Sequence, residues 1–285
     1  MKNKKAKENI AVNAVMRHIS KTLGFNDVKF HMQEPDVKER NRPACDFITE
    51  IGCRKIAIEH TTVDSIPNQR RDNSYFERLM VPLEKELLND LPSPGRYDIN
   101  IYTGKIPKGK QYNWDDIRKR IKEWCIKVAP NLKAAPGNCG ATGHYVQEQP
   151  EGVPFEVGLC KWEAIEPKLP NGNVLVGRFI PEDIEKLRLE AMQASLQTRA
   201  AKLEQYHHKG YRTILVFEDW DISLSSIGSI GDSFVSTMKK STDLYIPDEV
   251  YVYVSIAKIV CCLKFDNSLS PNAKISPQPY ECVNK

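Results

Sequence analysis

The chain has 285 residues, of which 41% are hydrophobic and 27% charged, and its formal net charge is +4. This ordinary globular composition excludes collagen-like, solenoid and largely disordered classes. The small positive charge permits an anionic partner without arguing for one.

The length suits one large domain or two small ones. The order of helical and strand patterns favours a single α/β domain over residues 1–285, with a mixed central sheet flanked by helices. We expect residues 104–180 to form an irregular elaboration within it, and residues 268–285 to form a loose tail.

Several classes of segment are missing from the sequence. No stretch approaches the ~20 apolar residues of a membrane helix. The basic N-terminus is not followed by the apolar region of a signal peptide. The eight cysteines show neither C-x-x-C spacing nor paired histidines, so reduced thiols are expected rather than a zinc site. These features predict a cytoplasmic protein with no membrane partner.

The N-terminal third begins with a predicted helix over residues 7–23, where apolar residues recur at helical spacing and Gly24 ends the pattern. Two β-rich segments then flank Gly52-Cys53. A glycine in the first position of a two-residue turn favours a type II′ hairpin. An entry loop followed by a further helix, kinked at Pro82, is predicted over residues 65 to about 91.

The middle of the chain is less regular. Alternation predicts a strand over residues 97–102, and an amphipathic pattern predicts a helix over residues 113–128. Residues 129–180 are rich in Pro and Gly. Short hairpins are expected there, around 153–162 and 173–179.

The C-terminal third contains the clearest helix, predicted over residues 181–209. Proline and acidic residues suit its first turn, and Gly210 ends it. Buried strands are predicted over residues 213–217 and over about 250–265. The expected buried stripe of the helix is Leu189, Met192, Leu196, Ala200 and Leu203.

The hairpin places two carboxylates opposite each other. If Gly52-Cys53 is the turn, Ile51 faces Arg54, and the same register puts Asp46 opposite Glu59. Facing residues project to one side of a sheet with Cβ atoms ~5 Å apart. Thr61 shares that side, because side chains alternate along a strand.

Two directly opposed like charges destabilise a sheet by up to ~1 kcal/mol. A bound divalent cation removes this repulsion, and one or two carboxylates are the usual protein ligands of Mg²⁺. Asp46 and Glu59 are therefore candidate ligands of Mg²⁺ or Mn²⁺. The alternative is that both lie at a solvated edge without a function.

The hairpin also resembles a known family. An initial helix, an Asp near a strand start, a tight hairpin and a strand of the form Ile56-Ala57-Ile58-Glu59-x-Thr61 resemble the PD-(D/E)XK superfamily, the restriction-endonuclease-like nucleases. The helix around Lys202 and the strand over 213–217 resemble the second helix and following strand of that family. The resemblance covers about half the chain. It implies metal-dependent cleavage of DNA or RNA.

The chain departs from the family pattern at three points. Cys45 precedes the Asp, and the proline is displaced to Pro43. Thr61 occupies the position of the family's lysine, which positions and activates the attacking water. Some members of the superfamily carry this basic group on a neighbouring helix. Candidates for that group are Gln69, Arg70, Arg71 and Lys202, and Glu8 is the candidate for the family's helical acid.

Other polar groups have competing interpretations. His60 faces away from Glu59 and is expected to pack under a helix with one hydrogen bond. His207-His208 suits a helix end, and Glu218-Asp219 is expected to cap the surface rather than form a second metal site. Three basic groups, at the N-terminus, in the loop at 105–110 and on the helix over 113–128, are either solvated or phosphate-attracting.

The sequence thus favours a metal-dependent nuclease that hydrolyses phosphodiester bonds of nucleic acid with an activated water. Asp46 and Glu59 are its predicted metal ligands, and Thr61 and Lys202 complete the predicted catalytic set. The alternative is a non-catalytic protein of the same fold that binds nucleic acid or a protein partner, which the absence of the motif lysine favours.

Overall fold

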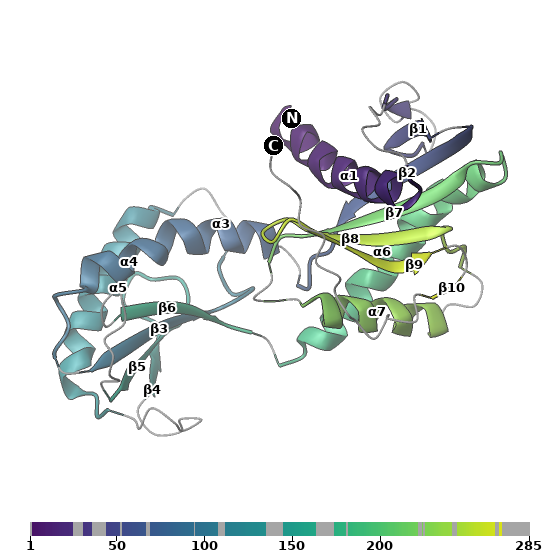
Figure 1. The fold of residues 1–285 in the computed structure, drawn as a ribbon. Coiled ribbons are helices and arrows are strands. Elements are labelled where there is room, and N and C mark those ends of the chain that lie inside the picture. The colour runs from purple at the N-terminus through teal and green to yellow at the C-terminus, as the bar shows by residue number, and fades with distance from the viewer. Residues whose placement is uncertain are drawn as a thin grey trace. The chain divides into compact units, whose positions relative to one another are not determined.

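A computed structural model shows an α/β fold with two mixed sheets flanked by helices. The chain divides into two compact units, one made of residues 1–66 with 183–285 and the other of residues 67–182 (Figure 1). Within the described residues, no helix is long and apolar enough to cross a membrane. The description omits residues 1, 25–30, 36–43, 52, 67–68, 94, 108–111, 135–144, 164–173, 181, 222–223, 225, 241–243, 266–267 and 270–285, and the side chains of residues 2–9.

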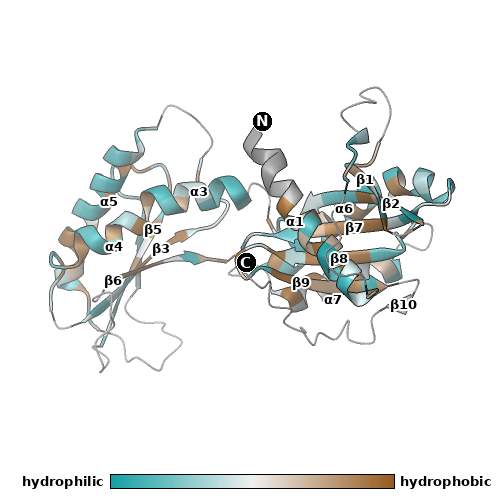
Figure 2. Cartoon of the chain, turned by 45° about the horizontal axis from the view of Figure 1, so that its top comes forward, coloured by the Kyte–Doolittle hydropathy of each residue, from teal (hydrophilic) through white to brown (hydrophobic). Residues whose placement is uncertain are grey.

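The first unit is built on a six-stranded sheet. Its strand order is β1-β2-β7-β8-β9-β10, and β2, β7 and β8 run parallel while the other pairs are antiparallel. Hydrophobic residues run through β7 and its neighbours (Figure 2). The strands are β1 (Phe47–Ile51), β2 (Arg54–Thr62), β7 (Arg212–Asp219), β8 (Glu249–Val254), β9 (Ile259–Phe265) and β10 (Ser268–Leu269).

Helix α1 (Lys2–Thr22) covers one face of this sheet. The predicted spacing is confirmed, since the buried positions of the helix fall on a single stripe. Side chains alternate along each strand, so every second strand residue points to the face that this helix covers. The resulting core contains Ala11, Val12, Val15, Met16, Ile19, Ile56, Ile58, Ile214, Val216 and Tyr251.

Helices α6 (Ile184–His207) and α7 (Ile227–Lys240) cover the opposite face. Most of the predicted stripe of α6 is confirmed as buried, but Leu189 is half-exposed and Arg188 takes the buried position beside it. The sequence reading missed α7, because its Gly, Ser and Thr residues are weak helix formers. Burial of Ile230 and Phe234 under the sheet stabilises it instead.

The predicted single strand over residues 250–265 is wrong. The chain turns at residues 255–258 and pairs β8 with β9 as an antiparallel hairpin. Lys258 adopts a φ of 54°, in the left-handed region that such turns use. Because both strands are apolar, the hydrophobic pattern alone did not reveal the turn.

The second unit has a four-stranded sheet of order β4-β5-β3-β6, which packs against α3, α4 and α5. It contains α3 (Gln69–Leu79), α4 (Val81–Leu87), β3 (Arg96–Tyr102), α5 (Trp114–Val128), β4 (Tyr145–Glu148), β5 (Val157–Trp162) and β6 (Val174–Phe179). The helix predicted after an entry loop within 65–91 is divided at Met80, two residues before Pro82 in the first turn of α4.

Two expectations for this region change. The hairpin expected around 153–162 begins further upstream, because β5 pairs antiparallel with the preceding strand β4 and also with β3. The hairpin expected around 173–179 is wrong, because this segment is the single strand β6, which pairs in parallel with β3. The elaboration expected over 104–180 lies in a compact unit that begins at residue 67 and has its own core. In the expected tail, residues 268–269 form β10 and the rest lies outside the described residues.

Candidate functional site

The β1–β2 hairpin has the register that the sequence predicts. Ile51 pairs with Arg54 and Phe47 pairs with Ile58. One residue further along, Asp46 lies directly before β1 and opposite Glu59. The turn itself is only partly described, since Gly52 lies outside the described residues.

Hydrogen bonds tie Asp46 and Glu59 together. The backbone N–H of Asp46 donates to Oε2 of Glu59 at 3.2 Å. The backbone N–H of His60 donates to Oδ2 of Asp46 at 2.8 Å. Within the described part of the chain, Oδ1 of Asp46 accepts no hydrogen bond, and Asp46 is half-buried.

Helix α6 brings two cations to the same carboxylate. Lys202 Nζ lies 2.7 Å from Oε1 of Glu59, and Arg199 Nη1 lies 2.8 Å from the same oxygen. Residues three positions apart share one face of a helix, so both side chains point to the sheet together. The side chain of Glu59 is 0% exposed, whereas those of Arg199 and Lys202 are 33% and 24% exposed.

Arg188 anchors the N-terminal end of α6. Its guanidinium, which is 2% exposed, donates to Ser65 Oγ at 3.0 Å and to the carbonyl oxygen of Leu224 at 2.6 Å. Ser65 follows β2, and Leu224 follows β7. This arginine therefore joins the helix to the loops at the carboxyl ends of two neighbouring strands.

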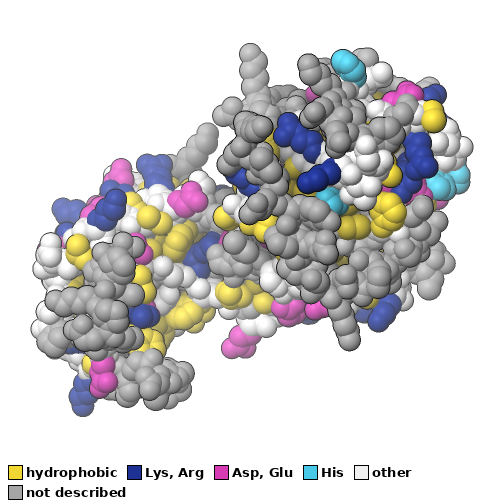
Figure 3. Space-filling model, viewed as in Figure 1, with side chains coloured by type: hydrophobic (Ala, Val, Ile, Leu, Met, Phe, Trp, Pro, Cys, Tyr) yellow, Lys and Arg dark blue, Asp and Glu magenta, His cyan; other side chains and the backbone are white. Residues whose placement is uncertain are grey.

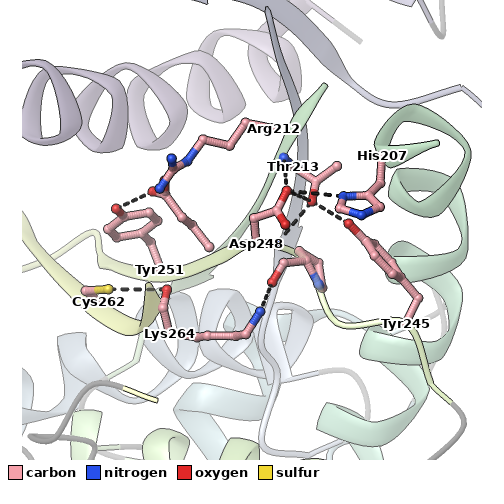
Figure 4. Close-up of polar contacts among 10 residues, drawn as sticks. His207, Arg212, Thr213, Tyr245, Asp248, Tyr251, Cys262 and Lys264 are labelled. Carbon is pink, nitrogen blue, oxygen red and sulfur yellow. Dashed lines mark hydrogen bonds and ion pairs between the residues drawn. The ribbon is translucent and has the colours of Figure 1, made fainter. Parts of the chain in front are cut away.

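A second polar cluster anchors the other end of α6 (Figure 4). Asp248 accepts hydrogen bonds from the backbone N–H and the hydroxyl of Thr213, at 2.8 and 2.9 Å. The Tyr245 hydroxyl lies 2.6 Å from the same Thr213 hydroxyl, and His207 Nδ1 lies 3.5 Å from Asp248. His207 brings the C-terminal end of α6 next to the start of β7 and the residue before β8.

Burial raises the pKa of the Glu59 carboxyl above its ordinary value. The nearby charge of Asp46 raises this pKa further, while Lys202 and Arg199 lower it. Desolvation is the largest of these effects. The site therefore keeps a carboxylate in a place where its negative charge needs cationic partners.

Cys45 does not supply a reactive thiolate. Burial raises the pKa of its thiol to about 12, and the thiol donates to the carbonyl oxygen of Phe47 at 3.3 Å. It remains protonated at neutral pH. Its place before Asp46, where the family has proline, is thus a packing position beneath α6.

The other predicted site residues lie on three different elements. Thr61 lies on β2, two residues beyond Glu59, and is half-exposed. Gln69, Arg70 and Arg71 lie on α3 in the second unit, where Arg71 pairs with Asp72 at 2.6 Å. Glu8 is on α1, and its side chain lies outside the described residues.

Sequence reasoning missed Arg199. A signal for it existed, because Arg199 and Lys202 lie on the predicted helix at a spacing that places two cations on one face. What the pattern did not reveal was which strand this face meets. The helix packs against β2 and β7, and only that packing brings both cations to Glu59.

The two acidic residues that end β7 are buried, so the expectation of surface capping is wrong. Glu218 and Asp219 are 2% and 0% exposed. Glu218 accepts hydrogen bonds from His60 Nε2 at 3.0 Å and from the hydroxyl of Ser255. The prediction that His60 is packed and hydrogen-bonded is confirmed.

The residues present offer a limited set of metal ligands. Across the described part of the chain, no group of three or more His, Cys, Asp or Glu side chains is arranged to hold a metal ion. Mg²⁺ commonly binds through one or two carboxylates, with water and substrate phosphate completing its octahedron. Asp46 Oδ1 and Glu59 Oε2 keep capacity to accept such a ligand, so the pair fits this sparse type of site.

The basic group on α5 is largely neutralised. Arg118 lies 3.0 Å from Glu86, Arg120 lies 2.8 Å from Asp116, and Lys122 lies 2.7 Å from Asp90. Acidic and basic side chains are interspersed on the second unit (Figure 3). These contacts support a solvated, self-compensated face for α5 rather than a phosphate-attracting one.

Comparisons of the chain with protein-family models, with curated proteins and with solved structures gave no match.

Proposed function

We propose that the chain is a metal-dependent nuclease, a divergent relative of the PD-(D/E)XK superfamily, which hydrolyses phosphodiester bonds of nucleic acid. The observation that carries the proposal is the meeting of Lys202 with Glu59 at 2.7 Å. A lysine beside the second carboxylate is what the family chemistry requires, and here it comes from α6 instead of from position 61.

Each residue of the site would have a separate role in hydrolysis. Asp46 and Glu59 would hold Mg²⁺ or Mn²⁺ through Asp46 Oδ1 and a Glu59 oxygen. Such an ion supplies Lewis acidity, lowering the pKa of water and neutralising charge on a phosphoryl oxygen. Lys202 would hydrogen-bond and orient the attacking water, and Thr61, which shares one side of β2 with Glu59, would assist through a bound water.

The buried environment of Glu59 supports this role. Charges interact more strongly where water is excluded, so a cation and a carboxylate held there are effective in orienting a reactant. The buried hydrogen bonds of Arg188 and the packing of α6 on the sheet help to position Lys202. Preorganised groups of this kind are the main source of catalytic stabilisation in enzymes.

A second candidate is a non-catalytic protein of the same fold, which binds nucleic acid or a protein partner. Thr61 in place of the motif lysine favours it, as does the complete burial of Glu59 beneath two cations. In that protein, Arg199 and Lys202 would serve only to compensate a buried carboxylate.

Cleavage assays separate the two candidates. Purified protein should cut DNA or RNA in the presence of Mg²⁺ or Mn²⁺ and fail in EDTA, and Glu59→Gln and Asp46→Asn should be inactive. A matched control is Glu50→Gln, because Glu50 is an exposed acid on β1 of the same hairpin. Binding without cleavage under every divalent metal would establish the non-catalytic candidate.

A further inference from the structure

Arg199 keeps hydrogen-bond donors that its contact with Glu59 does not use. Arg199 uses Nη1 on Glu59, and within the described residues its guanidinium makes no other hydrogen bond. A guanidinium carries five N–H donors in a planar fork. The side chain is 33% exposed, so unused donors and a permanent positive charge lie where α6 meets solvent.

With a divalent cation bound, the net charge of the site would be positive and would attract an anion. Two carboxylates, Asp46 and Glu59, are balanced by the two cations, Arg199 and Lys202. A divalent cation would add two positive charges, and a phosphodiester contributes one negative charge. Arginine matches the geometry of two phosphate oxygens through parallel N–H donors, whereas lysine acts as a compact point charge.

We propose that Arg199 binds a non-bridging oxygen of the phosphodiester, leaving Lys202 to the attacking water. The assignment rests on the proposed function and deepens it by naming the residue that recognises the phosphate. Arg199 thereby contacts the substrate, whereas Arg188 on the same helix is buried and only positions the helix.

The first test is the salt dependence of nucleic-acid binding, measured by fluorescence anisotropy with Ca²⁺ in place of Mg²⁺, so that a divalent cation is present, and only over times in which a gel shows the probe to be uncut. Losing one phosphate contact lowers the slope of log K against log salt by about 0.9 on duplex DNA and about 0.7 on a single strand. Arg199→Gln should show this decrease, and Arg199→Lys should retain the wild-type slope. Lys186→Gln, which removes an exposed cation from the same helix, should leave the slope unchanged.

An unchanged slope for Arg199→Gln, or a wild-type chain that binds neither duplex nor single strand, overturns the assignment. Thermal melting of each variant checks that it is folded. The test is independent of catalysis: if wild-type protein cuts nothing yet Arg199→Gln loses slope, the nuclease proposal fails while the phosphate contact stands.

A second test locates the contact at the scissile position. Replacing the scissile phosphate with a neutral methylphosphonate should lower wild-type kcat/KM by roughly tenfold or more, the value of a charged hydrogen bond. In Arg199→Gln this penalty should be smaller, because the arginine's share of the contact is already lost and only the share of the metal ion remains. Equal penalties in both proteins would show that Arg199 touches no oxygen of that phosphate.

Discussion

Lys202 Nζ lies 2.7 Å from Oε1 of Glu59, although 143 residues separate the two in the chain. The contact joins the strand that carries one carboxylate to a helix that begins only after the whole second unit. It brings a lysine to Glu59, whereas the motif position on β2 holds Thr61. The following predictions test whether this arrangement performs chemistry.

A lysine introduced at position 61 should partly replace Lys202. Lys202→Met should lower cleavage by roughly 10²–10⁴-fold, the usual contribution of a group that assists proton transfer. Adding Thr61→Lys to this variant should restore part of the lost rate, since position 61 lies on the same side of β2 as Glu59. Single-turnover rates give the measurement. No recovery in a folded double variant would argue that Lys202 acts only as a counter-ion.

Glu59 should affect stability in a pH-dependent way. Its pKa is raised in the folded protein, so the stability it contributes is present below its unfolded pKa and is lost as pH rises through the folded value. The melting temperature of wild-type protein relative to Glu59→Gln should therefore fall as the pH rises above about 4. At neutral pH the variant should melt at an equal or higher temperature. Glu50→Gln, an exposed control, should show no such trend.

Divalent metal should stabilise the folded protein through the two carboxylates. A ligand present at 100 times its Kd and bound only to the folded state adds about 2.7 kcal/mol. Mn²⁺ should thus raise the melting temperature of wild-type protein and of Glu50→Gln, and EDTA should reverse the effect. The double variant Asp46→Asn, Glu59→Gln should not respond. A response that persists in the double variant would place the metal elsewhere.

The buried stripe of α6 should carry a large share of the stability of the first unit. Leu196 is 0% exposed between the helix and the sheet. Leu196→Ala should lower the free energy of unfolding by roughly 2–5 kcal/mol, measured by urea denaturation. Gln197→Ala, at the exposed neighbouring position, should change it by less than about 0.5 kcal/mol. A small effect at Leu196 would contradict the packing of α6 on the sheet.

Much of the local structure could be predicted because it depends on short-range patterns. The spacing of apolar residues predicted α1, α5 and α6, and the glycine turn predicted the β1–β2 register that sets Asp46 opposite Glu59. Side-chain period and turn chemistry act over a few residues, so a sequence window contains them. The fold class follows from the same patterns.

The remaining features depend on contacts between distant segments. Only packing against the sheet makes α7 a helix, and only strand pairing divides residues 249–265 into two strands. The separate core of residues 67–182 and the burial of Glu218 and Asp219 are likewise invisible to local patterns.

The candidate site combines both kinds of information. By itself the sequence determined that Asp46 and Glu59 face each other, because a two-residue turn fixes every pair along a hairpin. The tertiary structure decided that Arg199 and Lys202 complete the site. The physical reason is that the side of α6 that meets β2 is set by burial of Met192, Leu196 and Leu203 under the sheet, and that burial carries the two cations to Glu59.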